Sequence, residues 1–495
     1  MKVTVSQLDK LEEQIRTNSA PKLEELVRSH GAGKIPRPLL SRYANLIRRL
    51  GGTGYSLKLL NPIVRDENKN PSVAEIIEYA SCLSRLGLID ESIGLLDKIK
   101  HEPQSEIQYE LAAAYVAKWD YPSSLAYFKK YLNSKDLSIY KICVGEINIA
   151  AALIYTDELN KSESLLLELL IKVQKFKFNL LIGNTLELLG EVAFIRGDFP
   201  RALQYFEESV RKVESSNPKY QLHLDKWKVI IRMLNEKGSK DSLKQFADVR
   251  KRVPQINDWH TIRELELFKA VATNDSHAIL NLYFGTPYEE YRKRILSIWG
   301  KPIKINNFYD RQLGSGLKKK KDNIFDVALG LDFSTGSQLK PGQSLHRLLQ
   351  ILSTDFYEPF STNKIFSMVF KDSFFNPITS PKQVYEVIRR LGEWFTKNKV
   401  PLIIVRSEGG YRLRATEIYK LRTHLKFEVR SKVDDFIFLL KSHGLTKNIS
   451  VKMIVEKLNL APRSVSRLLS GGVSERKLTR QGQAKMTTYA IIDDL

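Results

Sequence analysis

The stretch Val405-Arg-Ser-Glu-Gly-Gly-Tyr-Arg-Leu413 decides the fold of the C-terminal half of this chain. It continues the β-branched run at residues 402–405, and such residues favour extended strands. Gly409 and Gly410 can supply the positive backbone dihedral angles that a tight hairpin needs. The stretch therefore predicts two strands joined by a short turn, with Arg406 on the first strand and Arg412 on the second.

A helix is predicted directly before this hairpin. Ser380 stands at an N-cap position, Pro381 at the first helical position, and Gln383 where its amide can close a capping box. The apolar residues recur at three- and four-residue spacing and predict a buried stripe: Val384, Val387, Ile388 and Leu391. The other faces are polar and largely cationic, with Lys382, Gln383, Tyr385, Glu386, Arg389 and Arg390.

Two further helices are predicted upstream. The first is amphipathic and is marked by Leu345, Leu348, Leu349 and Leu352. Ser361 caps the second, which buries Ile365, Met368 and Val369. Three helices followed by a hairpin give the element order of a winged helix, a helix-turn-helix variant that binds DNA.

Residues 322–416 resemble the DNA-binding domain of the OmpR/PhoB response-regulator family. Ile388-Arg-Arg-Leu391 matches that family's recognition helix, Val405-Arg406 with Gly410-Tyr-Arg412 matches its hairpin, and the stretch 325–331 corresponds to its leading sheet. The resemblance implies that Arg389 and Arg390 meet the major groove or its phosphates, and that Arg406 enters or flanks the minor groove. The hairpin departs from the family pattern, because Ser407-Glu408 replaces one glycine and Glu408 adds a negative charge.

These observations predict a DNA-binding surface on the first head. Its members are Lys382, Gln383, Tyr385, Glu386, Arg389, Arg390, Arg406 and Arg412. An ordinary α+β domain with a solvated basic helix is the alternative, since a charged helix face is by itself a weak signal.

A second helix-turn-helix is predicted within residues 417–495. Residues 450–458 have the pattern of a short helix, 459–461 of a turn, and 462–469 of a second helix, while 477–491 reads as a basic hairpin. The stretch resembles the winged helices of MarR-like and related bacterial regulators. We predict DNA contacts from Arg463, Ser464, Ser466, Arg467, Arg480 and Lys485. A winged helix that mediates only protein contacts is the alternative.

Residues 1–300 predict a tetratricopeptide-like array of helix pairs. Small residues stand where two helices would cross and larger ones fill the next layer: Leu189, Gly190, Ala193, Gly197, Phe199, Ala202 and Phe206. Equivalents of Gly190 are assigned at Ala44, Ala80, Ala112 and Ala152. Such an array forms a curved solenoid whose concave groove binds a protein or peptide partner. An inert helical scaffold is the alternative. Helical periodicity continues from Pro218 to about Trp299 without assignable repeats.

Residues 301–321 predict a basic flexible linker, because glycine and serine precede the four lysines at 318–321.

Over the whole chain, 78 Lys and Arg against 56 Asp and Glu give a net charge of +22, which favours polyanionic partners without choosing between DNA, RNA and an anionic membrane. Cys82 and Cys143 lie in apolar stripes, which indicates buried thiols in a reducing compartment. We expect a cytoplasmic protein without a membrane segment.

Catalytic, metal-binding and cofactor motifs are missing from the sequence, so we expect neither an enzyme nor a resident cofactor or metal. The predicted fold class is mainly α, a tetratricopeptide-like α-solenoid followed by two winged-helix (α+β) domains. The predicted function is a bacterial, sequence-specific regulator of transcription that binds double-stranded DNA and holds a protein or peptide in its repeat groove; a homodimer is compatible with it. The alternative is a non-enzymatic adaptor whose winged helices mediate protein contacts.

Overall fold

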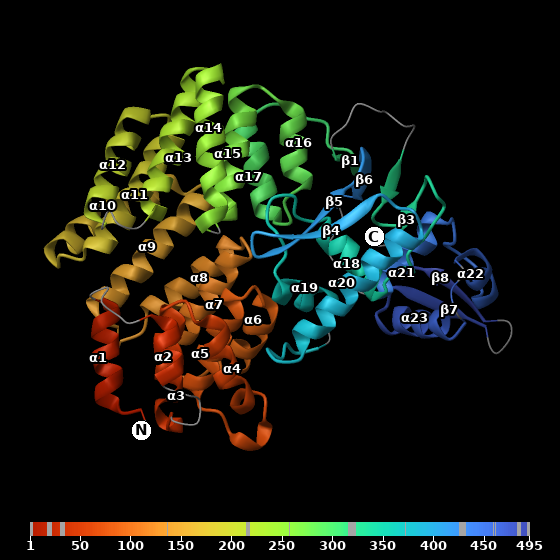
Figure 1. Cartoon of the computed structure of the whole chain (residues 1–495), viewed down its shortest axis with the longest axis horizontal. Coiled ribbons are helices and arrows are strands. Elements are labelled where there is room, and N and C mark those ends of the chain that lie inside the picture. The colour runs from red at the N-terminus through yellow and green to blue at the C-terminus, as the bar shows by residue number, and fades with distance from the viewer. Residues whose placement is uncertain are drawn as a thin grey trace. The chain divides into compact units, whose positions relative to one another are not determined.

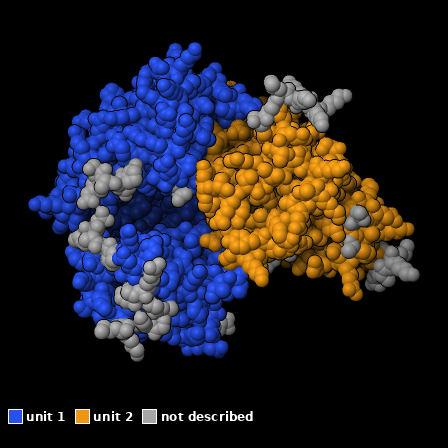
Figure 2. Space-filling model, in the orientation of Figure 1, with its two compact units in different colours: residues 1–279, 288–301, 374–380 blue, residues 280–287, 302–373, 381–495 orange. Residues whose placement is uncertain are grey.

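The computed structural model describes residues 3–16, 22–29, 35–135, 137–213, 218–256, 258–314, 323–371, 373–424, 432–458, 460, 462–482 and 487–492. It divides into two compact units (Figure 2). Unit 1 comprises residues 1–279, 288–301 and 374–380, and unit 2 comprises residues 280–287, 302–373 and 381–495.

Unit 1 is a mainly helical array (Figure 1). Its first helices are α1 (Val5–Arg16), α2 (Leu23–Ser29), α3 (Arg37–Arg49), α4 (Thr53–Val64), α5 (Val73–Arg85), α6 (Ile89–Lys98), α7 (Ser105–Ala117) and α8 (Tyr121–Leu132), with the short turn η2 (Glu67–Lys69) after α4. It continues with α9 (Ile139–Tyr155), α10 (Leu159–Lys175), α11 (Asn179–Ile195), α12 (Phe199–Lys212), α13 (Pro218–Asn235), α14 (Lys240–Arg252), η3 (Val253–Ile256), α15 (Trp259–Ala272) and α17 (Glu289–Trp299). Helix α16 (Ser276–Phe284) runs from unit 1 into unit 2. Consecutive helices from α3 to α15 pack against one another, so the packing continues beyond the repeats that the sequence allowed us to assign.

A hydrogen bond marks the crossing point within several hairpins. The hydroxyl of Ser56 donates to the carbonyl oxygen of Ala44 at 2.7 Å, and that of Ser92 donates to Ala80 at 2.7 Å. In the fourth hairpin Ser162 donates to Ala150 at 2.9 Å. Ala150, and not the predicted Ala152, therefore corresponds to Ala44 and Ala80. The sequence misled us because serines stand at both 162 and 164, and only the first is buried.

Helices α11 and α12 cross closely at Gly190. A methyl group added at Gly190 would lie 2.5 Å from the ring of Phe206. That ring cannot withdraw easily, because it stacks on Trp227 at a centroid distance of 4.9 Å and is buried. The small residue at this position is therefore a packing requirement.

Unit 2 is a smaller mixed α/β region. Its elements in chain order are β1 (Phe308–Leu313), β2 (Ile324–Asp326), β3 (Leu331–Asp332), α18 (Ser344–Leu352), α19 (Thr362–Val369), α20 (Ser380–Lys397), β4 (Leu402–Ser407), β5 (Gly410–Ala415), β6 (Tyr419–His424), α21 (Lys432–Ser442), α22 (Val451–Leu458), α23 (Pro462–Ser474), β7 (Leu478–Gln481) and β8 (Thr488–Ile491). The strands form a four-stranded sheet of order β1-β6-β2-β3 and two separate hairpins, β4-β5 and β7-β8.

The four-stranded sheet corrects two predicted boundaries. Strand β1 lies inside the predicted linker 301–321, yet all six of its residues pair antiparallel with β6. Residues 315–322, which carry the lysine run, lie outside the described residues. Strand β6 also pairs parallel with β2, so it completes the first head's sheet although the predicted boundary after 416 gave it to the second head. Its alternating burial, with Tyr419, Leu421 and Thr423 buried, explains the pairing.

The hairpin β4-β5 forms as the sequence predicts, but its turn differs. The positive φ angles belong to Glu408 (52°) and Gly409 (79°). Gly410 is the first residue of β5, and its Cα faces the main chain, where a methyl group would lie 2.9 Å from the carbonyl oxygen of Phe360. Ser361 caps α19 as predicted. Ser380 is instead buried at the start of α20 and its hydroxyl accepts from the N–H of Asn376, so the expected capping box with Gln383 is wrong.

Two modules of unit 2 share one element order of three helices and a hairpin. In the first, α18, α19 and α20 precede β4-β5; in the second, α21, α22 and α23 precede β7-β8. The second has a core of its own, which includes Phe436, Leu440, Ile454, Val465 and Leu469. Among the described residues, no helix is both long and apolar enough to cross a membrane.

We predict that Gly190→Ala destabilises the chain by about 1–3 kcal/mol, because the added methyl group overpacks the contact with Phe206. Gly94→Ala is the matched control: Gly94 lies exposed on α6 with open space around its Cα, so alanine there should stabilise by about 0.5–1 kcal/mol. Urea unfolding followed by circular dichroism measures both. Equal effects of the two substitutions would contradict the close crossing.

Candidate nucleic-acid interface and the groove of the helical array

Helix α20 presents the predicted residues of its basic face to solvent. Its buried side holds Val384, Val387 and Leu391 against the core of the first module. The following side chains are exposed: Lys382, Gln383, Tyr385, Glu386, Arg389 and Arg390. The amphipathic spacing alone accounts for this separation.

The two adjacent arginines of α20 differ in their surroundings. Arg389 forms ion pairs with Glu386, at 2.6 Å, and with Glu393. The hydrogen bond between Arg389 and Glu386 lowers the pKa of the glutamate and raises that of the arginine. The side chain of Arg390 is exposed and forms neither a hydrogen bond nor an ion pair with any described residue. Arg390 therefore carries the less compensated positive charge. The role of Glu393 was not predicted, although its four-residue spacing from Arg389 signals the pair.

The hairpin separates the two arginines that the sequence grouped together. Arg406 is exposed on β4 and pairs across the hairpin with Tyr411, so Arg406 and Arg412 project from opposite faces. The guanidinium of Arg412 donates to the carbonyl oxygen of Tyr357 at 2.6 Å and pairs with Glu408 at 3.1 Å. The predicted DNA contact of Arg412 is thus not supported by its position. Arg406 faces solvent, and its side chain forms no hydrogen bond or ion pair with the residues that the structure describes.

Helix α23 of the second module exposes Arg463, Ser466 and Arg467, and leaves Ser464 partly exposed. Val465 and Leu469 are buried on its other side. Arg480 is exposed on β7, while Lys485 lies outside the described residues. The arrangement repeats that of α20, with a buried apolar side and an exposed polar side on the third helix.

Buried ion pairs join helices of unit 1. Arg48 of α3 pairs with Glu78 of α5 at 2.6 Å, and both side chains are buried. Lys226 of α13 pairs with Glu264 of α15 at 3.0 Å, with 4% of the lysine side chain exposed. Buried ion pairs of this kind fix helices in one register, because removing one partner leaves an uncompensated charge.

His223 joins three segments of the array. Its Nδ1 lies 2.9 Å from a carboxylate oxygen of Glu187 on α11, and its Nε2 lies 3.0 Å from Asp258, the N-cap of α15. Burial would lower the pKa of His223, but the hydrogen bonds to Asp258 and Glu187 outweigh it, and the pKa is raised. The pKa values of Glu187 and Asp258 are lowered, because their hydrogen bonds to His223 outweigh burial. We call these three residues the His223 clasp.

Aromatic residues from distant helices meet in the array. Trp119, after α7, packs on Tyr291 of α17 at a centroid distance of 4.6 Å, and Tyr121 stacks on Tyr155 at 4.4 Å. Beside them lies a cavity of about 720 Å³, lined by Tyr121, Pro122, Tyr155, Thr156, Asp157, Phe194, Ile195, Gly197, Phe199, Leu234, Phe268, Val271, Glu290, Lys293, Arg294, Ser297 and Ile298. We call it the array pocket. Figure 2 shows that the visible face of unit 1 is hollowed.

Arg294, which lines the array pocket, has no carboxylate partner among the residues that the structure describes. The guanidinium of Arg294 lies over the ring of Tyr155 at 4.7 Å and forms no ion pair within the described part of the chain. Burial and the nearby carboxylates of Glu264 and Glu187 raise the pKa of Glu191 to about 7. An arginine in this setting retains its hydrogen-bond donors for a ligand. The described residues contain no group of three or more His, Cys, Asp or Glu placed to hold a metal ion.

No family model matches the sequence, and no curated protein matches it. Among solved structures, a Rap protein complexed with competence and sporulation factor is similar at a TM-score of 0.43 and 14% identity, over 59% of this chain and 88% of that one. The Rap conjugation gene regulator of the plasmid pLS20 in complex with the Phr* peptide reaches 0.38 and 12%, over 59% and 92%. Aspartyl phosphate phosphatase F from Bacillus subtilis reaches 0.34 and 13%, over 57% and 84%.

We predict that the His223 clasp makes stability depend on pH. The pKa of His223 is raised on folding. Its contribution to the free energy of unfolding is therefore complete below about pH 6.5 and is lost as the pH rises through the pKa of His223 in the folded protein. The carboxylates of Glu187 and Asp258 have the opposite pH dependence, because their pKa values are lowered on folding. Their contribution to the free energy of unfolding is lost as the pH falls below about 4. His223→Gln should therefore lower the urea midpoint more at about pH 5.5 than at about pH 8.5. An equal loss at both values would show that the imidazole is not protonated in the clasp.

Proposed function

We propose that this chain is a sequence-specific DNA-binding regulator of transcription whose helical array binds a peptide segment of a partner. The observation that carries the DNA-binding part is the repetition in unit 2 of one module, three helices and a hairpin, with a polar and basic face on the third helix each time. This order of elements is that of a winged helix, in which the third helix enters the major groove. The likeness of residues 388–391 and 405–412 to OmpR/PhoB-type domains supports the same proposal.

Helix α20 has the dimensions and chemistry for this role. It spans Ser380–Lys397, and its exposed side carries the amide of Gln383 and the guanidinium of Arg390, which suit adenine and guanine edges respectively. Arg406 on the adjoining hairpin offers a positive charge to the phosphate backbone. The net charge of +22 adds long-range attraction to any duplex.

We predict that Arg390→Ala weakens specific DNA binding by about 1–3 kcal/mol, because its guanidinium is free to contact a base edge. Arg389→Ala should weaken it less, because Glu386 and Glu393 already compensate that charge. The two substitutions remove the same side chain from neighbouring positions, so each controls for the other. Fluorescence anisotropy with a selected duplex and with a random duplex measures both. An equal loss of affinity for the selected and the random duplex would show that Arg390 contacts phosphates and not a base edge.

An adaptor is the second candidate function, and the ion pairs of Arg389 favour it. A helix face on which glutamates neutralise an arginine is less attractive to phosphates and is compatible with a protein surface. The two candidates differ in competition experiments. A DNA-reading module retains its selected duplex against excess bulk DNA, whereas an adaptor shows only salt-sensitive attraction without sequence preference.

The array pocket supports the second part of the proposal. Its aromatic walls, formed by residues such as Tyr155, Phe194 and Phe268, suit apolar side chains. Arg294 can bind a carboxylate there through its guanidinium. A short peptide with a carboxylate beside apolar residues fits both features.

We predict that peptides selected on the full-length protein from a random library contain an acidic group next to apolar residues. Arg294→Gln should weaken their binding about tenfold or more, because a charge-assisted hydrogen bond is lost. Lys212→Gln removes one positive charge at an exposed position of α12 that does not line the array pocket, and should have little effect. Peptides that bind both variants equally would place the peptide site elsewhere.

A further inference from the structure

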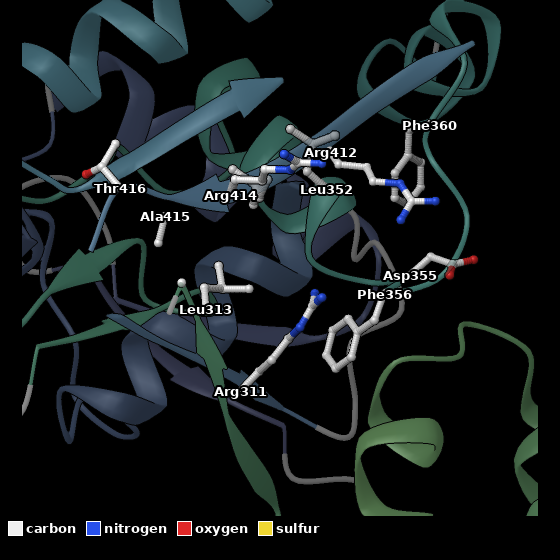
Figure 3. Close-up of a pocket in the computed structure, with 12 residues that line it drawn as sticks. Arg311, Leu313, Leu352, Asp355, Phe356, Phe360, Arg412, Arg414, Ala415 and Thr416 are labelled. Carbon is white, nitrogen blue, oxygen red and sulfur yellow. The ribbon is translucent and has the colours of Figure 1, made fainter. Parts of the chain in front are cut away.

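A second cavity lies inside unit 2, between the first sheet and the hairpin β4-β5. It has a volume of about 430 Å³ and is lined by Arg311, Leu313, Gly314, Leu352, Asp355, Phe356, Phe360, Arg412, Leu413, Arg414, Ala415 and Thr416. We call it the arginine pocket. Three guanidinium groups belong to it, one from β1 and two from β5 (Figure 3).

Arg311 is the central residue of the arginine pocket. Its guanidinium carbon lies 3.8 Å from the centroid of the Phe356 ring, which holds the side chain in place. The guanidinium of Arg311 forms neither a hydrogen bond nor an ion pair with the residues that the structure describes. Burial, with a further contribution from the positive charge of Arg412, lowers the pKa of Arg311 to about 10. The side chain is still a cation at neutral pH, and its hydrogen-bond donors remain available.

The carboxylates near the pocket compensate only part of this charge. Asp355 lines the pocket, but one of its carboxylate oxygens accepts the N–H groups of Tyr357 and Glu358, and Figure 3 shows the carboxylate directed away from Arg311. Glu408 pairs with Arg412 at the hairpin turn. Arg414 is exposed. Arg311 and Arg414 therefore have no carboxylate partner among the residues that the structure describes.

The pocket suits a small anion better than a duplex. Guanidinium groups bind phosphate through paired N–H donors, and Arg311 and Arg412 approach from different strands. Arg311 is recessed beside Phe356, whereas both ester oxygens of a phosphodiester in a duplex continue into the strand and block close entry. A terminal phosphate has no such restriction. Leu313, Leu352 and Phe360 add apolar walls for a small organic group.

We propose that the arginine pocket binds a small phosphate anion, either free phosphate or a phosphate monoester, with Arg311 as the principal ligand. Arg412 is held by Tyr357 and Glu408 as the second wall, and Arg414 attracts the anion at the rim. Because Arg412 and Glu408 belong to the hairpin β4-β5, an anion bound here would restrain the hairpin that carries Arg406. The site is independent of the proposed DNA contacts of α20.

Isothermal titration calorimetry on the full-length protein tests this proposal, with inorganic phosphate and phenyl phosphate as probes at constant ionic strength. Both probes should bind the wild type, and Arg311→Gln should weaken binding about tenfold or more. Arg311→Lys keeps the positive charge but loses the paired N–H donors. Its affinity for phosphate should therefore lie between those of the wild type and Arg311→Gln. Lys212→Gln removes one positive charge from an exposed position of α12 that does not line the arginine pocket, and it should leave binding unchanged.

The two probes distinguish the sources of the phosphate. Tighter binding of phenyl phosphate indicates a monoester, and equal binding indicates free phosphate. Thermal unfolding without the probes controls for folding, because it shows whether the Arg311 variants, which lose the contact with the Phe356 ring, remain folded. The proposal is overturned if the wild type binds neither probe, or if Arg311→Gln and Lys212→Gln weaken binding equally. It is likewise overturned if Arg311→Gln unfolds the protein and Arg311→Lys, folded, binds phosphate as wild type does.

Discussion

The pairing of β6 with both β1 and β2 is the constraint on which unit 2 depends. It joins residues 308–313 to residues 419–424, on either side of the first three-helix module. Side chains reinforce the pairing: Arg422 binds Asp310 through two hydrogen bonds of 2.8 and 2.9 Å, and His424 lies 3.0 Å from Asp326. Because β5 leads directly into β6, the hairpin cannot move far from β1. The proximity of Arg311 to Arg412 follows from this closure.

Charge compensation distinguishes structural from functional side chains throughout the chain. Arg48, Lys226 and His223 have carboxylate partners and hold neighbouring helices together. Arg390 on the exposed face of α20 and Arg311 in the arginine pocket have no such partner among the residues described. A cation that the protein does not neutralise is available to a ligand, and each of our proposals rests on a side chain of this kind.

The sequence predicted those features that depend on local patterns. The amphipathic spacing of α20 and the small residues of the helix hairpins could be read directly, because burial repeats with the helical period. Two local patterns were ambiguous. The adjacent glycines at 409 and 410 predicted a turn at those two residues, but the turn is formed by Glu408 and Gly409. The serines at 162 and 164 allowed two alignments of the fourth repeat, and the predicted one was wrong by two residues. The pairing of β1 with β6 was missed because it joins segments more than a hundred residues apart, next to a lysine-rich stretch that indicated a linker. The arginine pocket draws its residues from three separated segments, so no local pattern could reveal it.

The central claim is that unit 2 reads DNA sequence, and selection from a random duplex library tests it most directly. The full-length chain would be incubated with the library at about 0.15 M salt and with excess bulk DNA, so that non-specific attraction is suppressed. Our account predicts enrichment of one sequence motif in two clusters, one for each three-helix module, since each third helix would occupy its own stretch of major groove. Bound duplexes that show no enriched motif after repeated selection would contradict it, and would leave the basic faces of α20 and α23 as surfaces for protein partners.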